Sequence, residues 1–310
     1  MSSHKHLGVT LSRNLGWTDH IDDISLKAGK RVDILKGLKF KLSRKSLGIM
    51  YLTFIRPTME YCSVLWDNCG ELNEYKLEKT QIQAAREVSG ATVATKLSDL
   101  YNEVGWDSLS ARRKRSKLIL FYKIVHGMTP MYLQELLPNR SQPFMREASN
   151  FRSFKARTCI FNDSFMPSAT RLWNNLNRNV KELPTLAQFK GRLNKNKMKT
   201  NRLFYYGDRK LSVLHARLRL NCSSLNCHLA KIGVKDSQMC PCGAPVENTF
   251  HFLMECPLYI IHRDVMHNVV LKFAPFTTKT LLSGCDNCTY EENCMIFDAV
   301  HTYIKDTKRF

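Results

Sequence analysis

The sequence has no apolar run long enough to cross a bilayer, which takes roughly 20 residues as a helix. Its longest apolar runs, such as residues 49–55, are far shorter, and the residues after Met1 are polar rather than an apolar signal segment. We therefore expect a soluble, intracellular protein without membrane contacts, in the nucleus or the cytoplasm. Internal repeats and long heptad patterns are also missing, which argues against a solenoid or a coiled coil.

Acidic residues are scarce. The chain has 27 Asp and Glu against 47 Lys and Arg, a net charge of +20 at pH 7. Residues 211–310 hold 10 basic and 9 acidic residues (+1), so the other 37 basic and 18 acidic residues give residues 1–210 a net charge of +19. Such a field attracts polyanions, and nucleic acid is the commonest candidate. An anionic membrane, or solubility alone, are the alternatives.

A secretion signal is also lacking, so the eleven cysteines are expected to be reduced or metal-bound rather than paired in disulfides. Four potential ligands fall within seventeen residues: Cys240, Cys242, His251 and Cys256. Zinc prefers four such ligands in a tetrahedron, and a closed set of four leaves no open position for catalysis. We predict a structural zinc knuckle here. The alternative is a group of inert, buried thiols.

The residues around these ligands predict the local structure of the knuckle. Thr249 is expected to cap a short helix that carries His251 and Cys256. Because these two ligands are five residues apart, that helix has to bend or end near Cys256, and Pro257 is suited to ending it. Glu247 is the one carboxylate near the ligands that could act as a base, and no substrate site is evident.

A second group of cysteines resembles half of a metal site. Cys285 and Cys288 are separated by two residues, and Cys294 follows, but a convincing fourth ligand is missing. His267 or His301 could complete the set only through the tertiary fold. Free thiols are therefore the preferred interpretation of this group.

Periodicity and capping residues predict a mainly α fold, in which a helical bundle precedes a small helical tail domain with the knuckle. Helices are expected over residues 19–38, from Ser43 to a break or kink at Pro57, and over residues 71–88, 96–104, 109–126, 258–273 and 291–308. A short strand over residues 6–11 has no evident partner. The predicted divisions are residues 1–135, a basic connector over residues 136–210, and a C-terminal domain over residues 211–310.

The candidate phosphate-binding residues are Lys27, Lys30 and Arg31 in the first helix and Arg112, Arg113 and Arg115 in the helix over residues 109–126. Positive charge in the first half of a helix opposes the helix dipole unless an anion lies nearby, which favours a phosphate partner there. A solvated helix face is the alternative for any single lysine.

Basic and aromatic residues also alternate in the stretch over residues 139–162. Arg152 and Lys155 lie near Phe151 and Phe154, a pattern that can hold phosphates and stack bases. Alternatively, the phenylalanines of this stretch dock onto the helices.

Several ordered motifs carry a family resemblance: Trp17-Thr-Asp-His-Ile21, Phe54-Ile-Arg-Pro-Thr-Met-Glu-Tyr61, Leu77-Glu-Lys-Thr-Gln-Ile-Gln-Ala-Ala-Arg86, Gly105-Trp-Asp-Ser-Leu109 and Leu172-Trp-Asn174. Over roughly residues 6–195 they resemble the end of a jockey-like non-LTR retrotransposon reverse transcriptase (a LINE element). The resemblance implies that residues 1–135 are a thumb-like region that follows the catalytic palm. The cysteine and histidine cluster resembles the knuckle that ends many such polyproteins.

The polymerase of that family needs an aromatic-x-Asp-Asp turn and a further upstream aspartate to hold two metal ions. That turn is absent, and the one Asp-Asp pair, Asp22-Asp23, falls inside the first predicted helix. We therefore expect no enzyme activity, but a non-catalytic remnant of an RNA-directed DNA polymerase that binds RNA or an RNA–DNA template–primer. The alternatives are a protein-interaction module, which could meet a reverse-transcriptase partner in trans, and a non-functional, pseudogene-like fragment.

Overall fold

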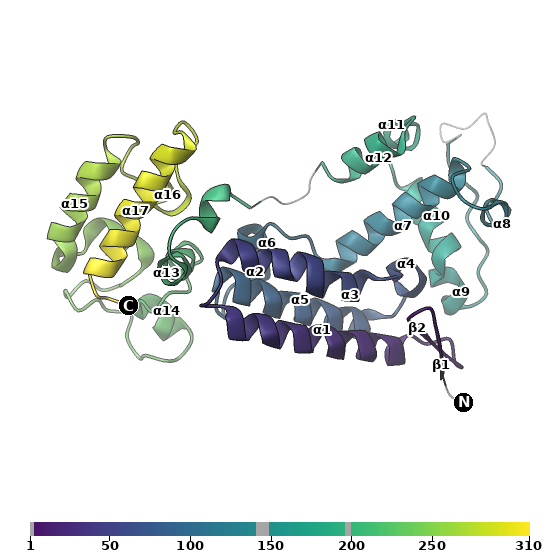
Figure 1. Ribbon diagram of the computed structural model, residues 1–310, viewed down its shortest axis with the longest axis horizontal. Coiled ribbons are helices and arrows are strands. Elements are labelled where there is room, and N and C mark those ends of the chain that lie inside the picture. Colours follow the sequence, from purple (N-terminus) through teal and green to yellow (C-terminus); the bar gives the residue numbers. More distant parts are fainter. Residues whose placement is uncertain (1–2, 141–148, 196–199) are drawn as a thin grey trace. The chain divides into compact units, whose positions relative to one another are not determined.

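A computed structural model describes residues 3–140, 149–195 and 200–310, and it confirms that the protein is mainly helical (Figure 1). The chain forms two compact units. Unit 1 comprises Met1–Lys30, Ile55–Gln81 and Asp107–Lys197, and unit 2 comprises Arg31–Phe54, Ile82–Trp106 and Met198–Phe310. Helices α1 (Thr18–Leu38) and α5 (Glu71–Ser89) contribute residues to both units. Within the described residues, no helix is long and apolar enough to span a membrane.

The chain begins with a β-hairpin rather than a single strand. Strand β1 (Ser3–His6) pairs antiparallel with β2 (Val9–Ser12), and the turn residues Leu7 and Gly8 have φ angles of 45° and 85°. A type I′ hairpin turn has positive φ at both central residues, a conformation that Gly8 adopts without strain. The prediction of an unpartnered strand over residues 6–11 is therefore wrong, because Gly8 turns the chain in the middle of that stretch.

The helices that lie wholly in unit 1 are α3 (Arg56–Glu60), α4 (Ser63–Trp66), α7 (Leu109–Val125), α8 (Met131–Gln134), α9 (Cys159–Asp163), α10 (Phe165–Asn174), α11 (Arg178–Lys181) and α12 (Leu186–Leu193). Helix α7 begins as predicted, because the Ser108 side chain accepts a hydrogen bond from the Ala111 N–H. Phe121 on α7 packs with Trp173 on α10 and Phe189 on α12 in the core of this unit.

Unit 2 begins with the last eight residues of α1 and continues into α2 (Arg44–Met50), which starts after Ser43 as predicted. The Ser43 side chain caps this helix by accepting a hydrogen bond from the Ser46 N–H. A π-helical segment, η1 (Tyr51–Ile55), follows it and leads into α3, so that Pro57 lies in the first turn of a new helix. Proline is tolerated there because the N–H groups of a first turn have no intrahelical acceptor. The helix expected to break or kink at Pro57 instead widens into the π-helical segment η1, just before Pro57.

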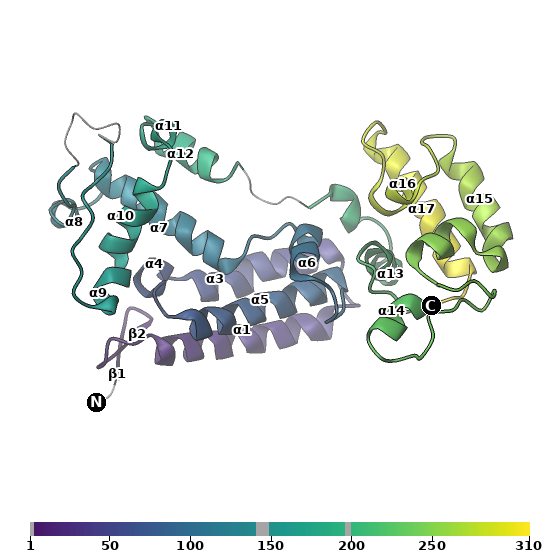
Figure 2. The same ribbon diagram turned by 180° about the vertical axis from the view of Figure 1, so that it is seen from behind.

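The remaining elements of unit 2 are α6 (Leu97–Val104), η2 (Arg202–Tyr205), α13 (Arg209–Arg219), α14 (Asn226–Lys231), η3 (His251–Glu255), η4 (Pro257–Tyr259), α15 (Ile260–Val270), α16 (Thr278–Ser283) and α17 (Tyr290–Asp306). Helices α15 and α17 pack against each other (Figure 2) and confirm the two helices predicted near the C-terminus. Met266 of α15 and Tyr303 of α17 share one core with Phe252 of η3. Through Phe252, this core therefore holds the segment that carries His251.

Candidate metal centre and basic surfaces

The four predicted ligands converge. The Sγ atoms of Cys240, Cys242 and Cys256 and a ring nitrogen of His251 all lie within 4.8 Å of one another. Cys240 Sγ is 3.7 Å from Cys256 Sγ, and Cys242 Sγ is 3.3 Å from His251 Nε2. Cys242 is half-buried and the other three residues are buried. This cluster could hold a metal ion.

A tight turn positions the first two thiols. The N–H of Cys240 donates to the Ala244 carbonyl, and the N–H of Gly243 donates to the Cys240 carbonyl, both at 2.9 Å. Gly243 has a φ of 94°, a conformation that favours glycine. A backbone hydrogen bond from Ala244 is the main cause that lowers the pKa of the Cys242 thiol to about 7, whereas burial raises the pKa of Cys240. Metal binding would release the protons of both thiols.

A π turn brings the other two ligands onto one side of the chain. In η3 the Cys256 N–H donates to the His251 carbonyl at 2.8 Å, an i→i+5 bond. An α-helix repeats every 3.6 residues and would place residues five apart on different faces, whereas the wider π turn brings them nearly into line. The bend expected near Cys256 is therefore this π turn.

The cap of this short helix lies one residue earlier than predicted. The Asn248 side chain accepts a hydrogen bond from the His251 N–H at 2.8 Å. The Thr249 hydroxyl instead donates to the Leu218 carbonyl of α13 at 3.1 Å. Asn248 caps because its side-chain oxygen reaches the third N–H beyond it. Thr249 ties the knuckle to α13.

Two carboxylates flank the cluster in different ways. Glu255 Oε2 lies 3.5 Å from His251 Nδ1, which leaves Nε2 of that ring facing the thiols. Glu247, the one candidate base, is 1% exposed, pairs with Arg309 at 2.6 Å and accepts the Asn226 N–H at 2.8 Å. The Glu247 carboxylate is thus engaged in holding the fold.

The second cysteine group does not converge with further ligands. Cys288 Sγ donates to the Phe273 carbonyl at 3.2 Å, and His301 is hydrogen-bonded to His215 at 3.2 Å. The His267 ring packs edge-on against Phe276. Over the part of the chain that the structure describes, the only cluster of three or more metal-ligating side chains is the knuckle.

The predicted phosphate-binding arginines of α7 have partners within unit 1. Each pairs with a carboxylate: Arg112 with Glu60, Arg113 with Asp67 and Arg115 with Asp107. The Arg113 side chain is 1% exposed, so it is not available to a bound polyanion. The anions that offset positive charge at the start of α7 come from the chain itself. The helix dipole therefore gives no argument for a phosphate there.

The three candidates on α1 lie closer to solvent. Lys27 forms an ion pair with Asp23 at 2.6 Å and stays about half exposed, and Lys30 is exposed. Arg31 Nη1 donates to the Phe54 carbonyl at 2.6 Å, with its guanidinium 4.3 Å from the Phe54 ring centre. Lys30 is thus the candidate whose charge the fold leaves most open to solvent.

Residues 139–195, which we call the basic segment, have more exposed positive charge than the candidate residues on α1 and α7. It has eleven Lys and Arg against three Asp and Glu, a net charge of +8. Its two described acids are already paired, Asp163 with Arg171 and Glu182 with Arg178. Glu147 and Arg146 lie outside the described residues. The exposed basic residues of the described part include Arg152, Lys155, Arg157, Lys190, Arg192 and Lys195.

The aromatic residues of this segment point to a structural role. Phe151 is 4% exposed and contacts Phe121 in the core of unit 1. Phe154 packs edge-on against Phe161 of α9. The docking interpretation of these rings is therefore confirmed for Phe151. The neighbouring basic residues remain on the surface.

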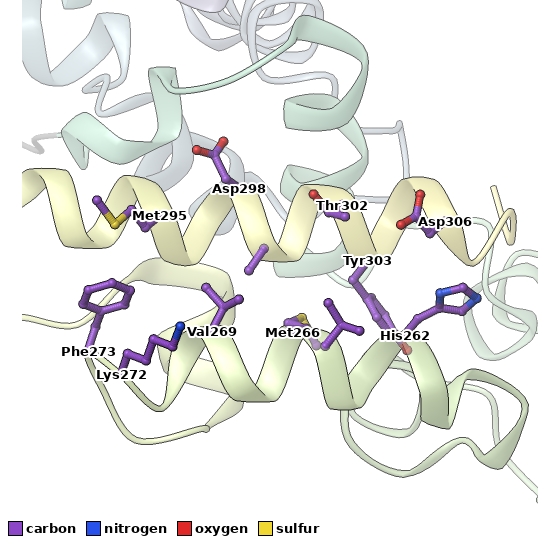
Figure 3. Close-up of a pocket in the computed structure, with 12 residues that line it drawn as sticks. His262, Met266, Val269, Lys272, Phe273, Met295, Asp298, Thr302, Tyr303 and Asp306 are labelled. Atoms are coloured by element: carbon purple, nitrogen blue, oxygen red, sulfur yellow. The ribbon is translucent and has the colours of Figure 1, made fainter.

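A groove of 430 Å³ runs between α15 and α17 (Figure 3). Met266, Val269, Phe273, Met295 and Tyr303 contribute much of its lining. This lining suits apolar contacts rather than phosphate binding, so we do not assign the groove to a polyanion. A protein-interaction module, one of the alternatives predicted from the sequence, would use a surface of this kind.

Comparison of the chain with protein-family models, with curated proteins and with solved structures finds no match. The resemblance to a non-LTR retrotransposon reverse transcriptase therefore stays a prediction from the sequence motifs.

Proposed function

We propose that this chain is a non-catalytic protein that binds RNA or an RNA–DNA hybrid through phosphate contacts, and that a structural zinc ion holds its C-terminal part. One observation carries the nucleic-acid proposal. In the basic segment, both described acids are already paired with arginines, yet at least six other basic side chains are exposed. Surface cations that lack acidic partners attract phosphates, and such binding is strongly salt-dependent and reads little sequence.

The donor set and spacing of the knuckle favour zinc. With Zn–S bonds of about 2.3 Å, a tetrahedral ion holds two thiolate sulfurs about 3.8 Å apart. The Cys240 and Cys256 sulfurs are 3.7 Å apart. Three thiolates and one imidazole would fill all four positions, so the ion would order the chain rather than activate water. Cys240, Cys242, His251 and Cys256 would hold it.

Two further contacts support a non-catalytic role. Asp22 and Asp23, the one Asp-Asp pair, lie on α1 and form ion pairs with Lys76 and Lys27, each at 2.6 Å. Such pairs are ordinary for charged residues on a helix surface. Glu247 beside the knuckle is held by Arg309. In each case the structure gives the carboxylate a structural partner.

The proposed function is tested by fluorescence anisotropy with a labelled single-stranded RNA and an RNA–DNA hybrid over a series of salt concentrations. In the triple variant Arg152→Ala, Lys155→Ala, Arg157→Ala, we expect at least tenfold weaker binding. The slope of log K against log salt should fall by about 2 to 3, because each phosphate contact releases about one counterion. The matched control is Lys272→Ala, Lys279→Ala, Lys305→Ala, which removes the same charge from residues 211–310.

The control triple should bind within about threefold of the wild type, because residues 211–310 have almost no excess charge. Equal losses in both triples would show that total charge alone matters and would remove the basic segment from the proposal. If the folded wild-type protein binds neither probe at low salt, the proposed nucleic-acid binding is refuted.

A further inference from the structure

Unit 2 contains a second cavity, of 470 Å³, with a lining unlike that of the groove in Figure 3. We call it the aromatic–basic pocket. It contains three cationic side chains and three aromatic rings: Arg44, Lys45, Arg202, Trp106, Tyr205 and Tyr290. None of its lining residues, all of which lie in the described part of unit 2, is acidic. A cavity of this size is typical of small-molecule and cofactor sites.

Arg44 supplies a buried polar group with unused bonding capacity. The residue is 3% exposed, and Nη1 and Nη2 donate to the Oε1 atom and the carbonyl of Glu103, both at 2.6 Å. Arg44 Nε, also buried, has no hydrogen-bond partner among the described residues. A buried N–H without an acceptor is unfavourable. Because Nε is closed to solvent and both Nη atoms are bonded to Glu103, contacts with a bound phosphate would come from the exposed cations of the pocket.

Two further cations lie where a phosphate could reach them. Lys45 and Arg202 line the pocket and are exposed. The Arg202 guanidinium lies 4.1 Å from the centre of the Tyr290 ring, a cation–π contact that holds the arginine beside the pocket. Glu103 offsets the charge of Arg44, so Lys45 and Arg202 are the cations of the lining that would attract a negatively charged ligand.

The aromatic rings of the pocket offer flat faces on which a base can stack. Trp106 is stacked on Tyr51 at 3.8 Å with an interplanar angle of 15°, so its orientation is fixed from one side. Tyr205 lies with its ring centre 5.6 Å from the Arg44 guanidinium. Aromatic faces beside cations are the combination that single-stranded nucleic-acid sites use, because every base has a face that can stack.

We propose that the aromatic–basic pocket binds one nucleotide of a single-stranded nucleic acid, with the phosphate at Lys45 and Arg202 and the base against the tyrosine rings. This inference rests on the proposed function and names a site for it outside the basic segment. An acidic peptide would satisfy the cations but would leave the rings without a flat partner. A nucleotide matches both.

The test compares Lys45→Ala, Arg202→Ala with a control of equal charge loss in unit 2, Lys231→Ala, Lys305→Ala. The probes are a ten-nucleotide RNA that contains 4-thiouridine and the DNA oligonucleotide of matching sequence with 4-thiothymidine. We expect the pocket variant to bind at least tenfold more weakly, with a salt slope lower by about 1 to 2, and the control to bind within threefold of the wild type. Ultraviolet cross-linking followed by peptide mapping should place adducts at Tyr205 or Tyr290.

A further variant, Arg202→Lys, keeps the charge and should retain most of the affinity, which separates loss of a phosphate contact from loss of structure. Wild-type affinity in the double variant would overturn the pocket, and so would cross-links confined to the basic segment. In both cases the proposed function would stand if the triple variant of the basic segment bound RNA more weakly than the wild type. Stronger binding of a polyglutamate peptide than of either oligonucleotide would overturn the nucleotide assignment.

Discussion

Arg309 donates hydrogen bonds to both carboxylate oxygens of Glu247, from Nε at 2.7 Å and from Nη2 at 2.6 Å. Burial alone would raise the pKa of Glu247, but the Arg309 guanidinium and the Asn226 N–H lower it below its ordinary value. Glu247 lies between Cys242 and His251 in the sequence, so the penultimate residue of the described chain fastens the loop that joins the two halves of the knuckle.

Arg309→Ala should therefore destabilise unit 2 by about 3–5 kcal/mol, because it leaves a buried carboxylate without its partner. Urea unfolding at pH 7 measures this loss, and the exposed neighbour Lys308→Ala is the matched control, with a change below about 0.5 kcal/mol. Since the Glu247 pKa is lowered by folding, its contribution is present above the unfolded pKa and is lost as pH falls. The difference in the free energy of unfolding between the wild type and Arg309→Ala should therefore become smaller at acidic pH. A difference that does not change with pH would contradict this prediction.

Metal content provides the second prediction. Elemental analysis of the purified protein should find one zinc per chain, and none in Cys242→Ser with Cys256→Ser, because that variant removes two of four ligands. The matched control, Cys285→Ser with Cys288→Ser, should keep the zinc. A strong chelator should lower the thermal stability of the wild type and of this control alike, since the binding free energy contributes to folding. Zinc-free but fully folded wild type would rule out the knuckle.

Glu103 carries the third prediction. It is 3% exposed and accepts hydrogen bonds from Arg44 and from Arg219, the latter at 2.7 and 2.8 Å. Burial alone would raise its pKa, but Arg219 and Arg44 together lower the pKa of Glu103 to about 2. Glu103→Ala should cost about 3–5 kcal/mol at pH 7, because two largely buried guanidinium groups lose their counter-charge. Asp99→Ala, on the exposed side of the same helix, should cost less than about 1 kcal/mol.

The sign of the pH dependence follows from the lowered pKa. The Glu103 contribution is complete above its ordinary pKa of about 4.3 and fades as pH falls towards 2. Denaturant unfolding gives the free energy of unfolding of the wild type and of Glu103→Ala at pH 7 and at pH 3. The difference between the two proteins should be smaller at pH 3. An advantage that grows in acid would show that the arginines do not act through the carboxylate charge.

A buried histidine pair gives the fourth prediction. His215 Nδ1 lies 3.2 Å from His301 Nε2, and His215 Nε2 lies 2.9 Å from the Leu281 carbonyl. Burial lowers the pKa of both rings, so both are neutral in the folded protein at pH 7. The contribution of the neutral rings to stability is complete above the ordinary histidine pKa of about 6.5. It decreases as pH falls below that value, because the unfolded chain binds protons that the buried rings do not.

Thermal unfolding from pH 7 to pH 5 measures this decrease. In His301→Gln, which removes one titrating ring, the stability should depend less steeply on pH than in the wild type. The exposed His4→Gln should leave the slope unchanged. Equal slopes in all three proteins would remove the histidine pair as a cause of acid sensitivity.

The features that the sequence predicted well are local ones. The knuckle ligands fall within seventeen residues, so their spacing alone indicated convergence. Ser43 and Ser108 each cap a helix through an N–H three residues on, a contact that a short pattern can reveal. The cap at Asn248 was missed because Thr249 beside it is an equally good capping residue.

The features that the sequence did not reveal depend on distant residues. Arg112 and Arg113 look like phosphate ligands along the helix, but their partners Glu60 and Asp67 lie 52 and 46 residues away. Helical spacing places a charge on a face and cannot tell which residues pack against that face. The pocket with Arg44 and Arg202 combines segments more than 150 residues apart, for the same reason.

The π turn at His251–Glu255 has a consequence for how tolerant the knuckle is to changes in length. Deleting one residue between His251 and Cys256 would turn the H-x4-C spacing into H-x3-C, and an ordinary α turn would then bring the two ligands together. Metal binding should therefore survive that deletion. The H-x4-C spacing on a π turn and the H-x3-C spacing on an α turn therefore place the two ligands equivalently. Either spacing can belong to a knuckle of this kind.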